Sequence, residues 1–291
     1  MSIGILIKVH DGIVLAADSA SSLTVAGPGA GQPVVVNVYN NANKIANLYK
    51  GLPIGCVAYG SGSIGSASIS TLLKDFRKGI MDTEQRFGTG TYTMEEVTKG
   101  LSSFLTNQVA NLGASDPKPT LGIMVGGYSA GKNLAEGWLL MIENGIANEP
   151  QLLRPEGDVG INWGGEGESI SRLVLGFSNS LPQVLSKAIK PEPSSTDMQQ
   201  LTALLRDSLQ APLVFAPMPI QDAIDVAEWL VDTASMFSRF SPGPSSVGGP
   251  TESAAITKHE GFKWIRRKHY YESKFNPEVS NGDQGGERQS G

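Results

Sequence analysis

Residues 2–18 read Ser-Ile-Gly-Ile-Leu-Ile-Lys-Val-His-Asp-Gly-Ile-Val-Leu-Ala-Ala-Asp. Two short apolar runs, rich in Ile and Val, are joined in this segment by Asp11-Gly12. Asp-Gly between such runs is the strongest short-range signal for a β-hairpin, because both residues tolerate the positive φ of a tight turn. We therefore predict a buried hairpin that begins at Ser2.

The rest of the chain contains groups of short strands separated by groups of helices. Apolar runs bounded by turn residues predict strands over 34–38, 43–48, 54–59, 120–125, 134–142, 160–165, 253–257 and 262–265. Apolar residues at helical spacing predict helices over 69–80, 94–109 and 220–237, and a helical region that begins at 169 and is interrupted at 190–196. Grouped strands and helices favour an α+β fold in which helices pack on antiparallel sheets.

The domain organisation follows from where apolar periodicity stops. A Gly- and Pro-rich stretch over 25–33 predicts a flexible loop, and no interior linker divides the chain. The last residues are polar, rich in glycine and almost free of apolar side chains. We expect a single domain over 1–272 and a disordered tail over 273–291.

Composition excludes several classes of protein. The chain has 291 residues, a formal net charge of −5 and a single cysteine. The negative charge gives no reason to expect a nucleic-acid partner, and one cysteine permits no intramolecular disulfide, as in a reducing compartment. No apolar stretch approaches the ~20 residues that span a bilayer, and no signal peptide is visible. We expect a cytoplasmic protein with no membrane partner.

Two glycine motifs resemble phosphate-binding loops. Gly60-Ser61-Gly62-Ser63-Ile64-Gly65 fits G-x-G-x-x-G between a predicted strand and a predicted helix. The acidic residue required about 20 positions later has no matching strand, because Asp82 and Glu84 lie between two predicted helices. A dinucleotide site therefore remains a distant alternative. Residues 126–132 fit G-x-x-x-x-G-K, but Asn133 follows in place of Ser or Thr, so a hairpin turn explains them better.

Metal and thiol chemistry find little support in the sequence. His10, His259 and His269 are scattered at spacings that fit no metal-binding pattern. Cys56 lies inside an apolar strand, where burial raises the pKa of a thiol and makes it inert. No G-x-S-x-G nucleophile elbow is present. We expect no metal and no organic cofactor.

The N-terminus carries the most informative chemistry. Ser2 follows Met1, and removal of a methionine before a small residue would expose a serine with a free α-amine. That amine has a reference pKa of about 7.7–8.0, so one residue could supply both nucleophile and general base. Asp18 and Lys44 are charges inside apolar strands; they could tune this nucleophile or form a plain ion pair that caps two strands.

These segments carry a family resemblance. Residues 8–19, then Asn43-Lys44-Ile45 and 57–62, resemble the proteasome β-subunit and bacterial proteasome-like family of N-terminal nucleophile hydrolases. A weaker likeness continues through 220–237, Gly248-Gly249 and 253–257, so it spans most of 2–265. The resemblance implies a four-layer αββα sandwich, a homo-oligomer such as a ring, and hydrolysis of peptide or amide bonds.

The resemblance also implies a role for each matching residue. Ser2 takes the place of the family's N-terminal threonine, Asp18 and Lys44 match its buried acid and lysine, and Gly60 matches the glycine whose N–H forms the oxyanion hole. The chain departs from the family pattern at five points: serine in place of threonine, no propeptide, Glu166 within a Gly-x-Gly element at 165–167, Phe240 and Val247 in place of an acid and a hydroxyl, and an insertion over 178–219.

Two functions from different classes follow. The first is hydrolysis of a peptide or protein substrate by Ser2, with Asp18, Lys44 and Gly60 in support. The alternative is a ring-forming or scaffold protein that keeps the fold and the ion pair without catalysis.

Overall fold

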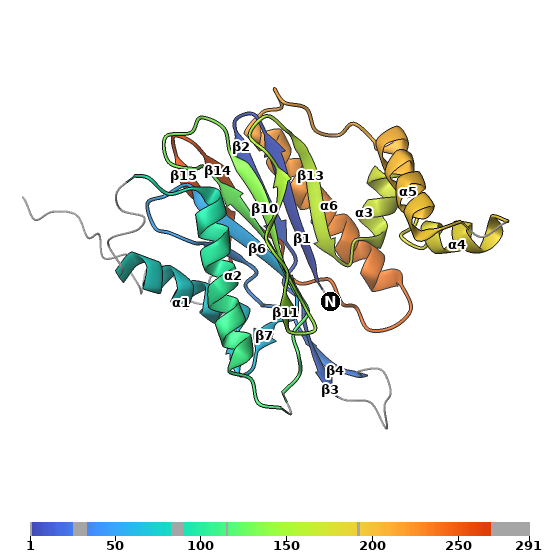
Figure 1. Cartoon of the computed structure of the whole chain (residues 1–291), viewed down its shortest axis with the longest axis horizontal. Coiled ribbons are helices and arrows are strands. Elements are labelled where there is room, and N and C mark those ends of the chain that lie inside the picture. Colours follow the sequence, from blue (N-terminus) through green and yellow to red (C-terminus); the bar gives the residue numbers. More distant parts are fainter. Residues whose placement is uncertain (1, 26–33, 83–89, 115, 191–192, 269–291) are drawn as a thin grey trace, which may run out of the picture.

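A computed structural model of the chain describes residues 2–25, 34–82, 90–114, 116–190 and 193–268 (Figure 1). Most of the loop expected at 25–33 and all of the tail expected at 273–291 lie outside the described residues, as does His269.

The predicted N-terminal hairpin forms the centre of the first sheet. Its two strands are β1 (Ile3–Val9) and β2 (Gly12–Ala17), paired in antiparallel register with Leu6 opposite Leu15. The sheet has the order β13-β1-β2-β14-β15, with β13 at Gly160–Gly165, β14 at Glu252–Thr257 and β15 at Gly261–Arg266. Every residue of β1 and β2 is buried, because both faces of this sheet are covered.

The second sheet is antiparallel and contains the other predicted hairpin. Its order is β11-β10-β9-β6-β5, and β12 pairs with β10. These strands are β5 (Ile45–Asn47), β6 (Ile54–Gly60), β9 (Leu121–Gly127), β10 (Glu136–Glu143), β11 (Ile146–Ala147) and β12 (Gln151–Arg154). The pairing of β9 with β10 confirms the hairpin expected between 120 and 142.

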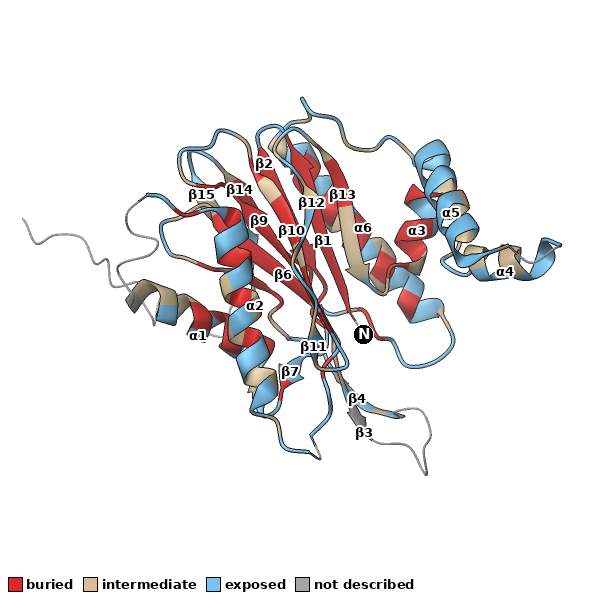
Figure 2. Ribbon diagram, viewed as in Figure 1, coloured by how far each residue is buried: buried red, intermediate tan, exposed pale blue. Residues whose placement is uncertain are grey.

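Helices cover the outer faces of the two sheets. On the second sheet lie α1 (Ile69–Asp82) and α2 (Met94–Ala110), while α3 (Glu168–Val174) and α6 (Ile220–Phe240) lie on the first. A third apolar cluster, which includes Leu6, Leu15 and Met124, takes its residues from both sheets and lies between them. Buried residues dominate the strands of both sheets (Figure 2). The α+β prediction, with helices on antiparallel sheets, is confirmed.

Three other pairs of elements lie outside the two main sheets. Helices α4 (Leu181–Ala188) and α5 (Ser195–Leu209), separated at the predicted interruption, project beside α3 and contain no buried residues (Figure 1). Strand β3 (Ser21–Val25) pairs with β4 (Val34–Tyr39) in a two-stranded sheet. A short pair, β7 (Ser63–Ile64) and β8 (Ala67–Ser68), precedes α1. Among the described residues, no helix is long and apolar enough to cross a membrane.

Candidate active site

Ser2 lies immediately before β1 and is only 2% exposed. Its hydroxyl oxygen accepts a hydrogen bond from the Gly60 N–H at 2.8 Å. Its carbonyl oxygen accepts another from the Glu166 N–H, also at 2.8 Å. The residue is therefore fixed on two sides, by the end of β6 and by the turn after β13.

Two glycines make this approach of three chain segments possible. Gly60 has a φ of +95°, and a Cβ added there would lie 2.5 Å from the Thr120 carbonyl oxygen. Gly165 has a φ of +94°, and its Cβ would lie 1.9 Å from the carbonyl oxygen of Ser2. Both contacts are with backbone, which cannot rotate away, so only glycine fits at either position.

Asp18, at the end of β2, connects Ser2 to the charged part of the site. The carboxylate is fully buried. Its Oδ1 accepts hydrogen bonds from the Ile3 N–H at 2.9 Å and from Lys44 Nζ at 2.5 Å. Its Oδ2 accepts from the N–H groups of Ala20 and Gly248, each at 3.0 Å. Four donors thus compensate for the loss of water around a buried charge.

Lys44 precedes β5 and is 8% exposed. Burial lowers the pKa of its ammonium group, because the charged form loses solvation, while the carboxylate of Asp18 offsets part of this effect. A second nearby cation, Lys268, lowers the same pKa further. Lys44 therefore releases its proton more readily than a lysine in water.

Two charged residues behind Lys44 were not predicted from the sequence. Glu252, at the start of β14, is 1% exposed, and its Oε2 accepts from the Lys44 backbone N–H at 3.3 Å. The same oxygen lies 3.3 Å from Lys268 Nζ, which also donates to Ser19 Oγ and to the Ala42 carbonyl. Burial lowers the pKa of Lys268 as well. Two acids and two lysines therefore form one network, in which Asp18, Lys44 and Glu252 are buried and Lys268 is partly exposed.

Two of the departures from the family pattern, Phe240 and Val247, lie at the end of α6 and in the loop that follows it. Phe240 is 75% exposed at the end of that helix, so it supplies no buried group. Val247 is fully buried, and its N–H, with that of Ser246, donates to the Ser238 hydroxyl at 3.3 and 3.1 Å. The next residue, Gly248, reaches Asp18. This loop therefore supports Asp18 through its backbone.

Comparison with known proteins finds similarity in structure and not in sequence. No protein family and no curated protein sequence matches the chain. Among solved structures, Anbu (ancestral beta-subunit) from Yersinia bercovieri matches with a TM-score of 0.50 and 13% identity. The match covers 92% of this chain and 89% of that chain. The fold is proteasome-like.

The absence of a matching family and the low identity to Anbu correct one expectation. Membership of the proteasome β-subunit family of N-terminal nucleophile hydrolases, expected from residues 8–19, 43–45 and 57–62, is wrong as an assignment. No family matches the sequence, and 13% identity shows a shared fold alone.

A cleft opens in the proteasome-like fold beside Gly60. It has a volume of about 590 Å³, and its lining comes from β3, from the segment after β6 and from residues 116–120. Ser21, Ser22, Ser61 and Ser63 are among the residues that line it, and Leu23, Pro117 and Pro119 add apolar lining. The Ser22 Oγ is buried and has no hydrogen-bond partner among the described residues.

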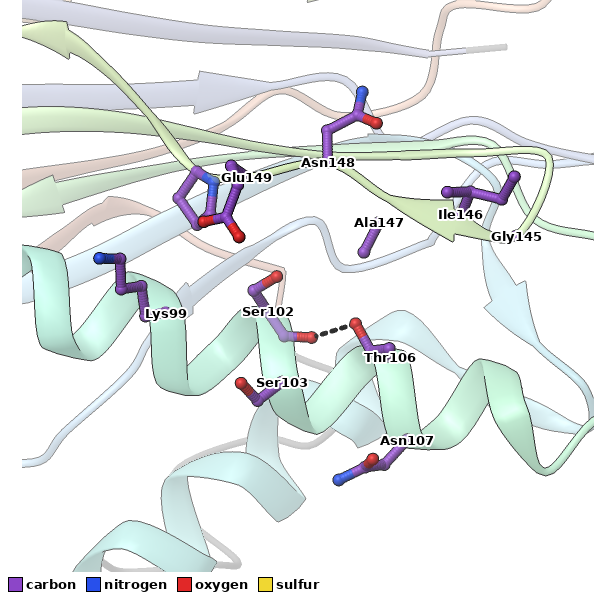
Figure 3. Close-up of a pocket in the computed structure, with 11 residues that line it drawn as sticks. Lys99, Ser102, Ser103, Thr106, Asn107, Gly145, Ile146, Ala147, Asn148 and Glu149 are labelled. Carbon is purple, nitrogen blue, oxygen red and sulfur yellow. Dashed lines mark hydrogen bonds between the residues drawn. The ribbon is translucent and has the colours of Figure 1, made fainter.

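A second groove lies between α2 and the segment 145–150. Its volume is about 750 Å³, and Lys99, Ser102, Thr106 and Glu149 are among its side chains (Figure 3). Its lining shares no residue with the Ser2 cluster.

The alternative motifs are not in the context that their chemistry requires. Strand β6 pairs only antiparallel with β5 and β9, and α1 starts at Ile69, beyond the 60–65 motif. The dinucleotide interpretation is therefore wrong, because it requires a parallel strand–helix–strand unit. Residues 128–132 form the turn between β9 and β10, as predicted. Cys56 is fully buried, and burial raises the pKa of its thiol to about 12, in agreement with a structural role.

Proposed function

We propose that this protein hydrolyses amide bonds, with Ser2 as an N-terminal nucleophile. The observation that carries the proposal is the convergence on one residue of a hydroxyl, a backbone donor and a buried ion pair. Ser2 Oγ lies 2.8 Å from the Gly60 nitrogen, and the neighbouring Ile3 N–H is bonded to Asp18, which holds Lys44. Removal of what precedes Ser2, Met1 in the printed sequence, would complete the site with a free amine.

The proposed reaction has two stages. Ser2 Oγ attacks the amide carbonyl carbon, and its proton passes through a water to the Ser2 amine as the new C–O bond forms. The Gly60 N–H then donates to the oxyanion. The amine returns the proton to the leaving nitrogen as the C–N bond breaks, and a second water hydrolyses the ester to a carboxylic acid and free Ser2.

Asp18 and Lys44 set the electrostatics of this reaction. A cation close to the N-terminus lowers the pKa of the Ser2 hydroxyl and of its amine, because it favours the less protonated forms. Asp18 keeps Lys44 in place and fixes the start of β1 through Ile3. The pair acts on Ser2 without entering the covalent steps.

Peptides or proteins are the proposed substrates, bound in the cleft beside Gly60. We propose a cytoplasmic protein with one domain over 1–272, arranged as a four-layer αββα sandwich, that needs no metal, cofactor, nucleic acid or membrane.

We also propose self-association into a ring or stack through α6, whose outer face exposes Trp229, Met236 and Phe240. Sedimentation of the wild type and of Trp229→Ala/Phe240→Ser tests this assembly, and a monomeric wild type would contradict it.

A non-catalytic scaffold is the second candidate, and one observation favours it. All four hydrogen bonds of Asp18 come from groups that hold strands and loops together. Such an ion pair stabilises the fold whether or not Ser2 reacts.

Intact mass and activity separate the two candidates. We expect a mass without Met1, and turnover of fluorogenic peptides that Ser2→Ala abolishes and Ser2→Thr preserves in part. Ser103→Ala, on the exposed face of α2, is the matched control and should keep full activity. A retained or acetylated Met1, or undiminished activity in Ser2→Ala, would contradict the hydrolase.

A further inference from the structure

Tyr59 occupies a slot between the two sheets that three glycines line. A Cβ added to Gly164 would lie 2.0 Å from the ring, and one added to Gly122 would lie 2.2 Å away. For Gly4 the corresponding distance is 3.2 Å. Each glycine comes from a different strand, so the ring lies in space that side chains fill elsewhere between the sheets.

The register shows that this slot spans both sheets. Gly122 of β9 is the direct cross-strand partner of Tyr59 in the second sheet. Gly4 and Gly164 are paired with each other in the first sheet, on β1 and β13. The phenol OH donates to Met141 Sδ at 3.4 Å, and burial raises the pKa of Tyr59 to about 12. The side chain therefore stays neutral and acts by packing.

The neighbours of the slot are the parts of the candidate site. Gly60, which directly follows Tyr59, donates to Ser2 Oγ. Gly4 is two residues after Ser2 on β1, and Gly164 precedes Gly165, which packs against the Ser2 carbonyl. A ring wedged at this point fixes the end of β6 against the starting end of β1 and the last residues of β13.

We infer that Tyr59 is a positioning residue whose ring sets the distance between the Gly60 N–H and Ser2 Oγ. As far as it concerns rate, this inference rests on the proposed hydrolase; as far as it concerns geometry, it stands alone. A displacement of about 1 Å at a reacting group can cost roughly 100-fold in rate. Loss of one oxyanion donor costs roughly 100- to 1,000-fold.

Crystal structures and kinetics of three variants test this inference. In Tyr59→Ala we expect Gly60 N to move beyond hydrogen-bond distance of Ser2 Oγ, and kcat to fall about 100-fold. Tyr59→Phe keeps the ring, so the 2.8 Å contact and a kcat within about threefold should remain. Phe76→Ala removes a buried ring of α1 that packs against Phe104 of α2, a comparable loss of packing, and should leave both quantities unchanged.

The Gly60–Ser2 distance decides the outcome whether or not the protein hydrolyses amides. Inactive wild type would contradict the proposed function, while the distance in Tyr59→Ala would still test the positioning role. A Gly60 N–H that remains bonded to Ser2 Oγ in that variant would overturn the inference. If Tyr59→Ala does not fold, Gly164→Ala places a methyl group of the first sheet against the intact Tyr59 ring. That variant should also break the hydrogen bond between the Gly60 N–H and Ser2 Oγ.

Discussion

Two lysines are buried at opposite ends of β1, and their surroundings differ. Lys44 lies at the Ser2 end and faces the carboxylate of Asp18. Lys8, in β1 itself, is 1% exposed and donates to the backbone carbonyls of Pro155 and Glu156. In both cases burial is the main cause of a lowered pKa. A buried lysine with a lowered pKa is therefore not by itself a sign of catalysis.

What distinguishes the two ends is the set of groups around each ammonium. Beside Lys44 lie a hydroxyl with a backbone donor, a fully bonded carboxylate and an adjacent cleft. Lys8 instead joins a loop to the sheet, next to Arg154, which donates to Asn162 at 2.7 Å and to Asp158 at 2.9 Å. The first arrangement contains a nucleophile, while the second only satisfies polar groups at the end of a sheet.

The largest difference between the two ends should come from Lys44→Met. This substitution leaves Asp18 as a buried carboxylate without its cation, which costs about 3–5 kcal/mol of unfolding free energy. Activity should fall at least ~100-fold. Urea unfolding and peptide turnover measure the two effects, and exposed Lys50→Met controls for the loss of one positive charge.

The double variant Lys44→Met/Asp18→Asn separates stability from chemistry. Neutralising both partners should restore much of the stability, because no charge is left buried alone. Activity should stay low. Full activity in the double variant would show that the ion pair is structural only.

Glycines at the two ends of β13 allow a matched test of backbone approach. Gly165→Ala brings a Cβ to 1.9 Å from the Ser2 carbonyl, whereas Gly160→Ala brings one to 3.0 Å from the movable guanidinium of Arg154. Both positions have positive φ, so both variants should lose about 1–3 kcal/mol to strain. Only Gly165→Ala should also lose roughly 100-fold in kcat. Equal losses of kcat in the two variants would show that the Ser2 end of β13 matters no more for the reaction than the Lys8 end.

The sequence alone predicted the frame of the site because that frame depends on local signals. Asp11-Gly12 fixes a hairpin, the hairpin brings Asp18 back beside Ile3, and a strand that ends in glycine places Gly60. The strand predicted at 34–38 forms as β4, but its place in the fold could not be predicted from local signals. Val34 and Val36 are 48% and 53% exposed in a two-stranded arm outside the core.

Contacts between distant segments could not be predicted from one sequence. Glu252 and Lys268 meet Lys44 from more than 200 residues away, and neither position has a local pattern that marks it. The slot around Tyr59 is equally hidden. Glycines in strands usually indicate bulges or turns. Only the packing of the two sheets against each other shows that Gly4, Gly122 and Gly164 make room for the Tyr59 ring.

A smaller effect is expected for Lys8→Met. The variant leaves the carbonyls of Pro155 and Glu156 without their donor, at a cost of about 1–3 kcal/mol. Because Lys8 is five residues along β1 from Ile3, kcat should stay within about twofold of wild type. Urea unfolding and turnover again supply the measurements. A large drop in kcat with little loss of stability would contradict a purely structural role for Lys8.

The smallest expected effect is a pH dependence of stability at the Lys8 end. The pKa of Lys8 is lowered by burial, and the charges of Asp158, Glu136 and Glu156 only partly offset this, while Arg154 adds to it. Below the ordinary lysine pKa of about 10.4, the unfolded chain therefore binds more protons at this site than the folded chain. Unfolding free energy from Lys8 then rises with pH in that range, by at most about 1.4 kcal/mol per pH unit.

The buried thiol of Cys56 acts in the opposite direction. Its pKa is raised to about 12, so the unfolded chain loses this proton first and stability falls above about pH 8.5. Comparing wild type with Lys8→Met at pH 8 and pH 10 cancels the cysteine, which both proteins share. The difference in free energy of unfolding between wild type and Lys8→Met should be larger at pH 10 than at pH 8. A difference that shrinks in that interval would mean that the folded protein binds the Lys8 proton more tightly than the unfolded chain does, and would contradict a pKa that burial lowers.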